Sequence, residues 1–347
     1  MNCNNYKNKL IIKMKTFSIK RLVLMLLAIV SLASCTRTDI EAPLVYPNPY
    51  KVLEDLNTIK DYATIKVISR TTAMAVGDMG QVIKTTDQGV TWDKLDLGTT
   101  NYLNDVDFTS DQIGWIVGES SVIKKTTNQG LNWTDKKPAT LPSTENVLAV
   151  KFLNENIGVC TTATGKILMT QDGGENWTIK VAKNAIGADI VTALRSIYIK
   201  DTTTFYLVGS AGIILKTTDF GTTFTVLPTA QATNSATTIL YRIKSPSNKV
   251  AYTCGSGGMV LKINLENDAI TSVKPPMTET MFGISFINDN VGYVVGKFGL
   301  IFKTTDAGTS WIREKSGVSS TLTDVAYWDE NLGYIVGNKL ILKSKKD

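Results

Sequence analysis

The chain has 347 residues, of which 37 are Lys or Arg, 31 are Asp or Glu, and none is His. The first 34 residues hold six of the bases and no acid, so the remainder carries 31 residues of each sign. A neutral body lacks the basic surplus typical of nucleic-acid binding. The absence of histidine excludes Ser-His-Asp triads, His-ligated zinc and imidazole acid–base catalysis.

Residues 1–34 have the form of an export signal. A basic start from Met14 precedes a run of 12 mostly apolar residues, Leu22 to Ala33, which is too short to span a bilayer. Residues 1–13 are interpreted as a mis-assigned upstream start. The segment LASC then resembles a bacterial lipobox, which implies cleavage before Cys35 and diacylation of that residue. We therefore expect a lipid-anchored envelope protein, with 35–45 as a linker.

That anchor predicts an outer-membrane location, because Thr36 rather than Asp follows the cysteine. Whether the protein faces the periplasm or the cell surface stays open. An ordinary signal peptide with an incidental cysteine is the alternative interpretation. Two further cysteines, Cys160 and Cys254, lie in apolar runs of separate repeats, and we expect two buried free thiols.

An internal repeat occupies the rest of the chain. A Gly that closes an apolar strand recurs every 41 to 47 residues, at Gly77, Gly118, Thr162 (in the Gly position), Gly209, Gly255, Gly296 and Gly337. Each unit contains four short strand signals separated by turn residues, the pattern of a propeller blade. We therefore predict an all-β fold, a single seven-bladed propeller over 46–347. The last unit ends after its third strand, so the segment Tyr50 to Leu53 is expected to complete that blade and cover its edge.

A turn motif follows the third strand in five of the units. It reads Thr-x-(Asp/Asn)-x-Gly-x-x-aromatic and places its acceptor at Asp87, Asn128, Asp172, Asp219 and Asp306. Asp or Asn accepts backbone N–H groups in such a turn, and Gly takes a positive φ. These side chains are interpreted as structural and not as metal ligands, since they lie in separate blades. The fifth unit lacks the motif, and we expect an irregular outer turn there.

The motif resembles the Asp box, or bacterial neuraminidase repeat. Together with second strands reading GYVVG and GYIVG, it is most similar to the photosystem II stability/assembly factor family. The resemblance implies a seven-bladed propeller that acts as a non-enzymatic assembly factor and holds membrane-protein intermediates. We expect a monomer that needs no cofactor or metal. Sialidases and other glycan-active proteins share the repeat, so a glycan-binding or glycan-hydrolysing protein is one alternative and a surface adhesive lipoprotein another.

A candidate binding face follows from the register of the repeats. The starts of the first strands and the connections between second and third strands share one face of a propeller. They carry Asp78, Asp105, Glu119, Arg195, Tyr241, Arg242, Lys297, Phe298 and Asp324, with Met79 and Phe282 beside them. Mixed charges and aromatic side chains around a central mouth favour recognition of a protein partner. The sialidase alternative requires an arginine trio, and only Arg195 and Arg242 fall at the mouth.

Overall fold

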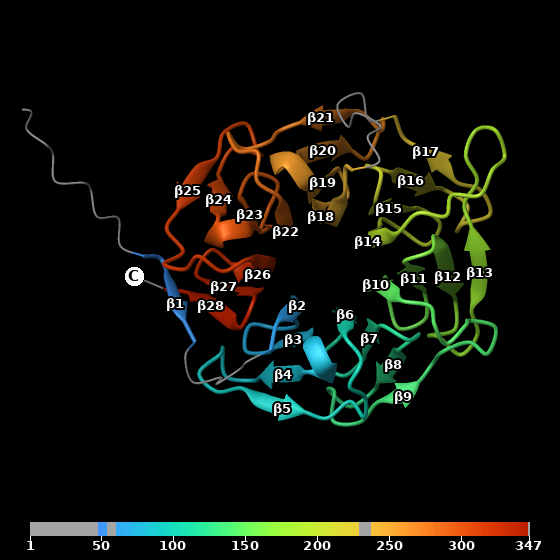
Figure 1. Ribbon diagram of the computed structural model, residues 1–347, viewed down its shortest axis with the longest axis horizontal. Coiled ribbons are helices and arrows are strands. Elements are labelled where there is room, and N and C mark those ends of the chain that lie inside the picture. The colour runs from blue at the N-terminus through green and yellow to red at the C-terminus, as the bar shows by residue number, and fades with distance from the viewer. Residues whose placement is uncertain (1–47, 54–59, 229–236, 346–347) are drawn as a thin grey trace, which may run out of the picture. The chain divides into compact units, whose positions relative to one another are not determined.

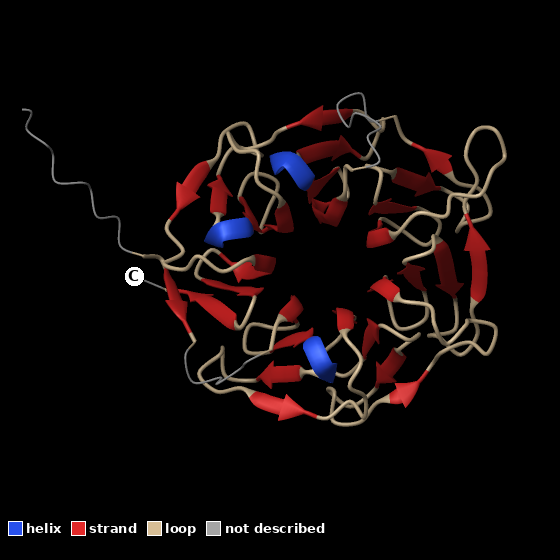
Figure 2. Cartoon of the chain, viewed as in Figure 1, coloured by secondary structure: helices blue, strands red, loops and turns tan. Residues whose placement is uncertain are grey.

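The computed structural model describes residues 48–53, 60–228 and 237–345. The signal, the lipobox and Cys35 lie outside these residues. The described chain forms seven four-stranded antiparallel sheets, arranged as blades around a common centre (Figures 1 and 2). The predicted all-β seven-bladed propeller is therefore confirmed. No helix in the described part of the chain is long and apolar enough to cross a membrane.

Each blade takes one strand from each of four concentric rings. The innermost ring contains β2 (Tyr62–Val67), β6 (Leu103–Phe108), β10 (Val147–Phe152), β14 (Leu194–Ile199), β18 (Leu240–Ser247), β22 (Met281–Phe286) and β26 (Leu322–Asp329). The second ring contains β3 (Ala73–Gly77), β7 (Gly114–Gly118), β11 (Gly158–Thr162), β15 (Phe205–Gly209), β19 (Val250–Gly255), β23 (Gly292–Gly296) and β27 (Leu332–Gly337). These second strands are buried along their whole length, which explains their apolar sequences.

The two outer rings complete the blades. The third ring contains β4 (Val82–Thr85), β8 (Ile123–Thr126), β12 (Lys166–Thr170), β16 (Ile214–Thr217), β20 (Val260–Asn264), β24 (Ile301–Thr304) and β28 (Leu340–Ser344). The outermost ring contains β5 (Asp93–Leu95), β9 (Thr134–Asp135), β13 (Thr178–Val181), β17 (Thr225–Val226), β21 (Ile270–Ser272), β25 (Ile312–Glu314) and β1 (Tyr50–Val52).

The N-terminal strand closes the ring, as the sequence predicts. β1 pairs antiparallel with β28, with Tyr50 opposite Ser344 and Val52 opposite Leu342. Tyr50 is 2% exposed, and its hydroxyl donates to the Glu314 carboxylate of the sixth blade and lies 3.0 Å from the Tyr327 hydroxyl. This strand covers the edge that the seventh blade would otherwise expose.

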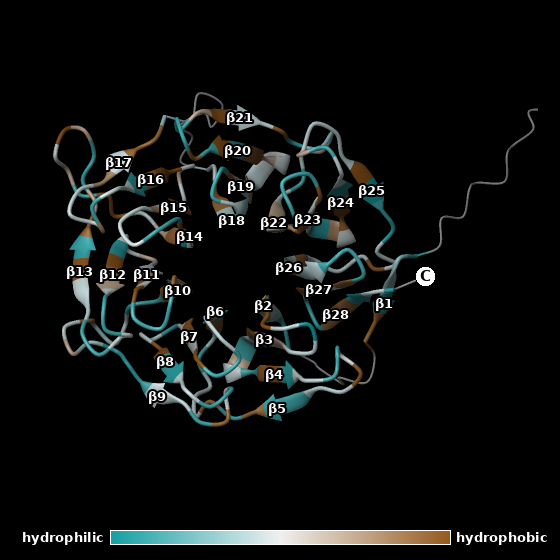
Figure 3. Ribbon diagram, turned by 180° about the vertical axis from the view of Figure 1, so that it is seen from behind, coloured by the Kyte–Doolittle hydropathy of each residue, from teal (hydrophilic) through white to brown (hydrophobic). Residues whose placement is uncertain are grey.

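The core is divided among the blades. Seven clusters of buried apolar side chains each join two neighbouring blades, so that every blade is buried on both faces. Figure 3 shows apolar residues along the strands and polar residues in many of the loops. Cys160 and Cys254 are buried in two of these clusters as free thiols, as expected.

The outer turn of the fifth blade does not have the hydrogen bonds of the repeated motif. It is a short closed hairpin in which the Asp268 N–H donates to the Asn264 carbonyl at 2.9 Å. The Asp268 carboxylate accepts from Lys216 at 2.6 Å and from the Tyr206 hydroxyl at 3.0 Å, both on the fourth blade. Loss of the repeat motif thus leaves an ordered turn that is fixed by contacts with its neighbour.

Candidate binding face around the central mouth

A bulge near the start of every innermost strand shapes the mouth. The pairing register between the first and second strands shifts at the second residue of all seven. A bulge re-aims the side chain of the extra residue. The bulged residues are Ala63, Asn104, Leu148, Arg195, Tyr241, Phe282 and Thr323, and together with Tyr102 and Arg242 they line a cavity of about 150 Å³.

Three of the bulged side chains form a continuous contact. The Arg195 guanidinium lies 5.5 Å from the ring centre of Tyr241, within the range of a cation–π interaction. The Tyr241 and Phe282 rings meet edge to face, with centroids 4.8 Å apart. Arg195 makes no ion pair among the residues described, and its Nε donates to the Ser210 hydroxyl at 3.4 Å. Its charge is therefore available to a ligand at the mouth.

Arg242 has a different environment, although the sequence placed it beside Arg195. Its side chain is 12% exposed, its Nε lies 3.7 Å from the Asp324 carboxylate, and it donates to the Ala63 carbonyl at 3.5 Å. Burial acts to lower its pKa, but Asp324 and Asp105 outweigh that effect and raise it. Arg242 of the fifth blade is thus the centre of a buried network that contacts blades one and seven at the mouth.

Both carboxylates of that network are occupied by hydrogen bonds from the fold. Asp324 is 1% exposed and accepts from the Thr64 hydroxyl at 2.5 Å and from the Val325 N–H at 2.9 Å. Asp105 accepts from the Val106 N–H at 3.0 Å and from the Val150 N–H at 3.1 Å. Burial raises the pKa of the Asp105 carboxyl. The structure therefore brings the two predicted acids near the mouth, but it places them as supports of Arg242.

The other predicted residues lie on the rim. The N–H groups of Asp78, Glu119 and Lys297 donate to the carbonyls of residues that directly precede the innermost strands. These bonds place the three turns on the face of the mouth, as expected, but their side chains do not line the central cavity. The predicted face therefore divides into a mouth, a buried support and a rim.

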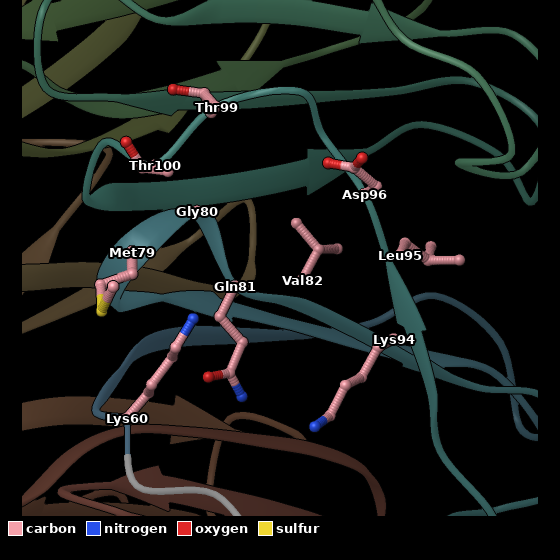
Figure 4. Close-up of a pocket in the computed structure, with 10 residues that line it drawn as sticks. All are labelled: Lys60, Met79, Gly80, Gln81, Val82, Lys94, Leu95, Asp96, Thr99 and Thr100. Atoms are coloured by element: carbon pink, nitrogen blue, oxygen red, sulfur yellow. The ribbon is translucent and has the colours of Figure 1, made fainter.

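Two rim turns expose bulky apolar side chains. Met79 and Phe298 occupy the left-handed region at φ 52° and 57°, which is uncommon for large residues, and are 54% and 63% exposed. A hollow of about 420 Å³ lies beside Met79, where Lys60, Gln81 and Lys94 also point (Figure 4). Another of about 600 Å³ lies beside Phe298. The same left-handed conformation recurs at Ser120, Ala211 and Gly257 in the equivalent turns and therefore belongs to the repeat. The exposed apolar side chains themselves favour a contact surface.

A further rim element was not predicted from the sequence. The connection from β13 to β14 forms a hairpin in which Lys183 pairs with Asp189 and Asn184 bonds Ala188. It exposes Ile186 at its tip, 88% exposed, and Val191 is 72% exposed. The signal for it was the interval between Thr162 and Gly209, the longest of the series.

The acceptors of the repeated turn motif lie apart from the mouth. Asp87 accepts from the Thr91 N–H at 2.9 Å and from the Thr91 hydroxyl at 2.6 Å, and these bonds lower its pKa to about 2. Asn128, Asp172, Asp219 and Asp306 accept equivalent bonds in their own turns. Within the described ranges, no three potential metal ligands of the His, Cys, Asp or Glu type lie together.

Comparison with known proteins agrees with this geometry. Residues 46–196 match the family model described as photosynthesis system II assembly factor YCF48. A structure titled YCF48 bound to D1 peptide is 21% identical, with 87% of this chain and 99% of that chain covered at a TM-score of 0.68. YCF48 from Cyanidioschyzon merolae is also 21% identical, over 86% of this chain and 98% of the other, at a TM-score of 0.68.

A glycoside hydrolase is among the similar structures as well. The GH74 enzyme of Niastella koreensis is 16% identical, at a TM-score of 0.66. The match covers 82% of this chain but 52% of the enzyme. No curated protein matches the chain. The resemblance to the YCF48 assembly-factor family is confirmed, and these structures share the propeller fold.

Proposed function

We propose that the protein is a non-enzymatic, lipid-anchored scaffold that binds a segment of a partner protein on the face of the mouth. The observation that carries this proposal is the set of exposed apolar and aromatic side chains on that face. Met79 and Phe298 stand on rim turns of that face, and Arg195 and Tyr241 line its mouth. Exposed apolar side chains with an arginine and aromatic residues among them are typical of protein-binding surfaces.

The chemistry of the mouth supports binding in preference to catalysis. Glycoside hydrolysis requires two carboxyl groups that are free to reach the scissile bond, one of them as an acid. Asp105 and Asp324 already accept hydrogen bonds from neighbouring blades, and Arg242 lies next to Asp324. Neither is positioned to exchange a proton with a substrate.

The similar structure of YCF48 with a D1 peptide supports a peptide segment as the ligand. By that analogy, we propose an assembly or stability role toward proteins of the cell envelope. The anchor on Cys35 would hold the propeller at a membrane, since acyl chains contribute about 0.8 kcal/mol per buried methylene. Palmitate labelling of the wild-type chain and of Cys35→Ser tests the anchor, and equal labelling of both would contradict it.

A matched pair of arginine variants tests the binding face. Arg195→Ala removes a charge at the mouth that no ion pair uses. Arg70→Ala removes an exposed arginine that pairs with Asp329 at 2.7 Å, away from the mouth. We expect both variants to melt like the wild type, and only Arg195→Ala to recover less of a cross-linked, identified partner. Equal recovery by the two variants would refute the assignment.

A further inference from the structure

A cluster of three lysines around one aspartate lies deeper in the ring than the mouth. Lys66 on β2 and Lys151 on β10 donate to the same carboxylate oxygen of Asp107 on β6, at 2.8 and 2.9 Å. The two ammonium nitrogens are therefore near neighbours, although like charges repel. These three residues stand at the same position in adjacent blades, three residues after the bulge.

The single carboxylate of the cluster has no capacity left for a further cation. Its second oxygen accepts the Phe152 N–H at 2.9 Å, and the side chain is 4% exposed. Burial acts to raise the pKa of Asp107, but Lys151 and Lys66 outweigh it and hold that pKa below its usual range. Asp107 is therefore ionised and contributes one negative charge against two positive charges.

Lys244 adds a third positive charge from the fifth blade. It occupies the same position after the bulge of β18, it is exposed, and its side chain makes no hydrogen bond or ion pair within the described ranges. Burial lowers the pKa of Lys151 to about 8, with repulsion from Lys66 and Lys244 acting in the same direction. The side chains of Lys66 and Lys151 remain 27% and 33% exposed, so solvent reaches the cluster.

The surrounding groups do not neutralise this excess. The equivalent positions of the other three blades hold Tyr198, Ser285 and Ala326, which are uncharged at neutral pH. A further acid, Asp105, accepts backbone N–H groups and acts electrostatically on Lys66 and Lys244 as well as on Arg242. The three lysines exceed Asp107 by two positive charges, and counting Asp105 as well leaves an excess of at least one, inside a ring of low-dielectric blades where charge is concentrated.

We propose that Lys66, Lys151 and Lys244 form a binding site for a phosphate-type oxyanion, either inorganic phosphate or the phosphate group of a monoester. A lysine ammonium presents three donors and suits phosphate as a point charge. A phosphate-type oxyanion would balance the excess positive charge and accept the N–H donors that Asp107 leaves free. The site is separate from the mouth and does not depend on the proposed function.

Phosphorus-31 NMR titration of the purified protein at pH 7 tests the site directly. We expect the inorganic phosphate resonance to broaden in a way that saturates at one phosphate per protein. Phosphate should also raise the melting temperature more than chloride does at equal ionic strength. Lys244→Met should weaken phosphate binding at least about tenfold, because it removes one of the three positive charges that face the anion. In phosphate-free buffer the same variant should melt at or above the wild-type temperature, since it relieves repulsion without removing a contact.

Two further arms make the outcome decisive. Lys183→Met, which removes an exposed lysine paired with Asp189, should leave the phosphate titration unchanged. O-Phosphoserine that displaces phosphate would identify the site as one for monoesters, whereas failure to displace it would limit the site to the free ion. The proposal is overturned if the broadening does not saturate, or if Lys244→Met and the wild type titrate alike.

Discussion

Closure of the ring by the N-terminal strand makes a prediction that can be worked out from one side chain. Tyr50 is 2% exposed between the sixth and seventh blades, and β28 is the strand with which β1 pairs. A buried aromatic side chain of this kind removes about 150–250 Å² from water, and truncation to alanine typically costs ~3–5 kcal/mol. We expect Tyr50→Ala to lower the free energy of unfolding by that amount and to expose the edge of β28.

A second variant separates the hydroxyl from the ring. Tyr50→Phe keeps the packing but leaves the half-buried Glu314 carboxylate without its donor, at a cost of ~1–3 kcal/mol. Tyr198→Phe is the control, because its hydroxyl bonds Asn248 at an exposed position, and it should change stability by less than about 0.5 kcal/mol. Urea denaturation followed by fluorescence gives all three values. A Tyr50→Ala protein within about 0.5 kcal/mol of the wild type would refute closure by β1.

Three further predictions concern other parts of the fold. The hydrogen bonds of its turn lower the pKa of Asp87 to about 2, so its contribution to stability is complete above about pH 4 and is lost as the pH falls toward 2. Asp87→Asn should therefore lose less melting temperature than the wild type between pH 5 and pH 2.5. An unchanged loss would contradict the role of the Asp87 carboxylate. Burial raises the pKa of both thiols, that of Cys254 to about 12. Neither Cys160 nor Cys254 should therefore react with a thiol reagent at pH 8 until urea is added. Rapid labelling of the native protein would disprove their burial. Arg242→Ala leaves Asp324 buried without its cation and should destabilise the protein by ~3–5 kcal/mol in urea denaturation, whereas a neutral effect would show that the network is dispensable.

The repeat predicted the architecture well because its information is local. Each turn motif specifies one hairpin, and the glycines of the second strands specify close approach. A Cβ at Gly114, for example, would lie 2.5 Å from the Phe108 ring. Seven such units at near-constant spacing predict a closed ring, because a closed ring buries both faces of every blade. The position of Tyr50 in the last blade followed from counting the strands.

The site was harder to predict because it depends on register and on charges from different blades. Arg195 and Arg242 are alike in the sequence and both line the cavity of the mouth, yet Arg242 is also held in an ion pair with Asp324, whereas Arg195 has no ion pair within the described residues. No local pattern shows that Lys66 and Lys151, distant in sequence, share one oxygen of Asp107. The hairpin that carries Ile186 was missed because it adds residues between two repeats without any repeat pattern of its own.

The central claim is that the partner binds the face of the mouth, and site-specific photo-cross-linking tests it most directly. A photoreactive amino acid replaces Phe298 on the rim in one protein and Leu131 in a turn of the outer blade edge in another; the two side chains are similarly exposed, at 63% and 71%. We predict that the probe at position 298 forms an adduct with one defined protein, which mass spectrometry identifies, and that the probe at position 131 does not. Adducts of that protein from position 131 with none from position 298 would contradict the account.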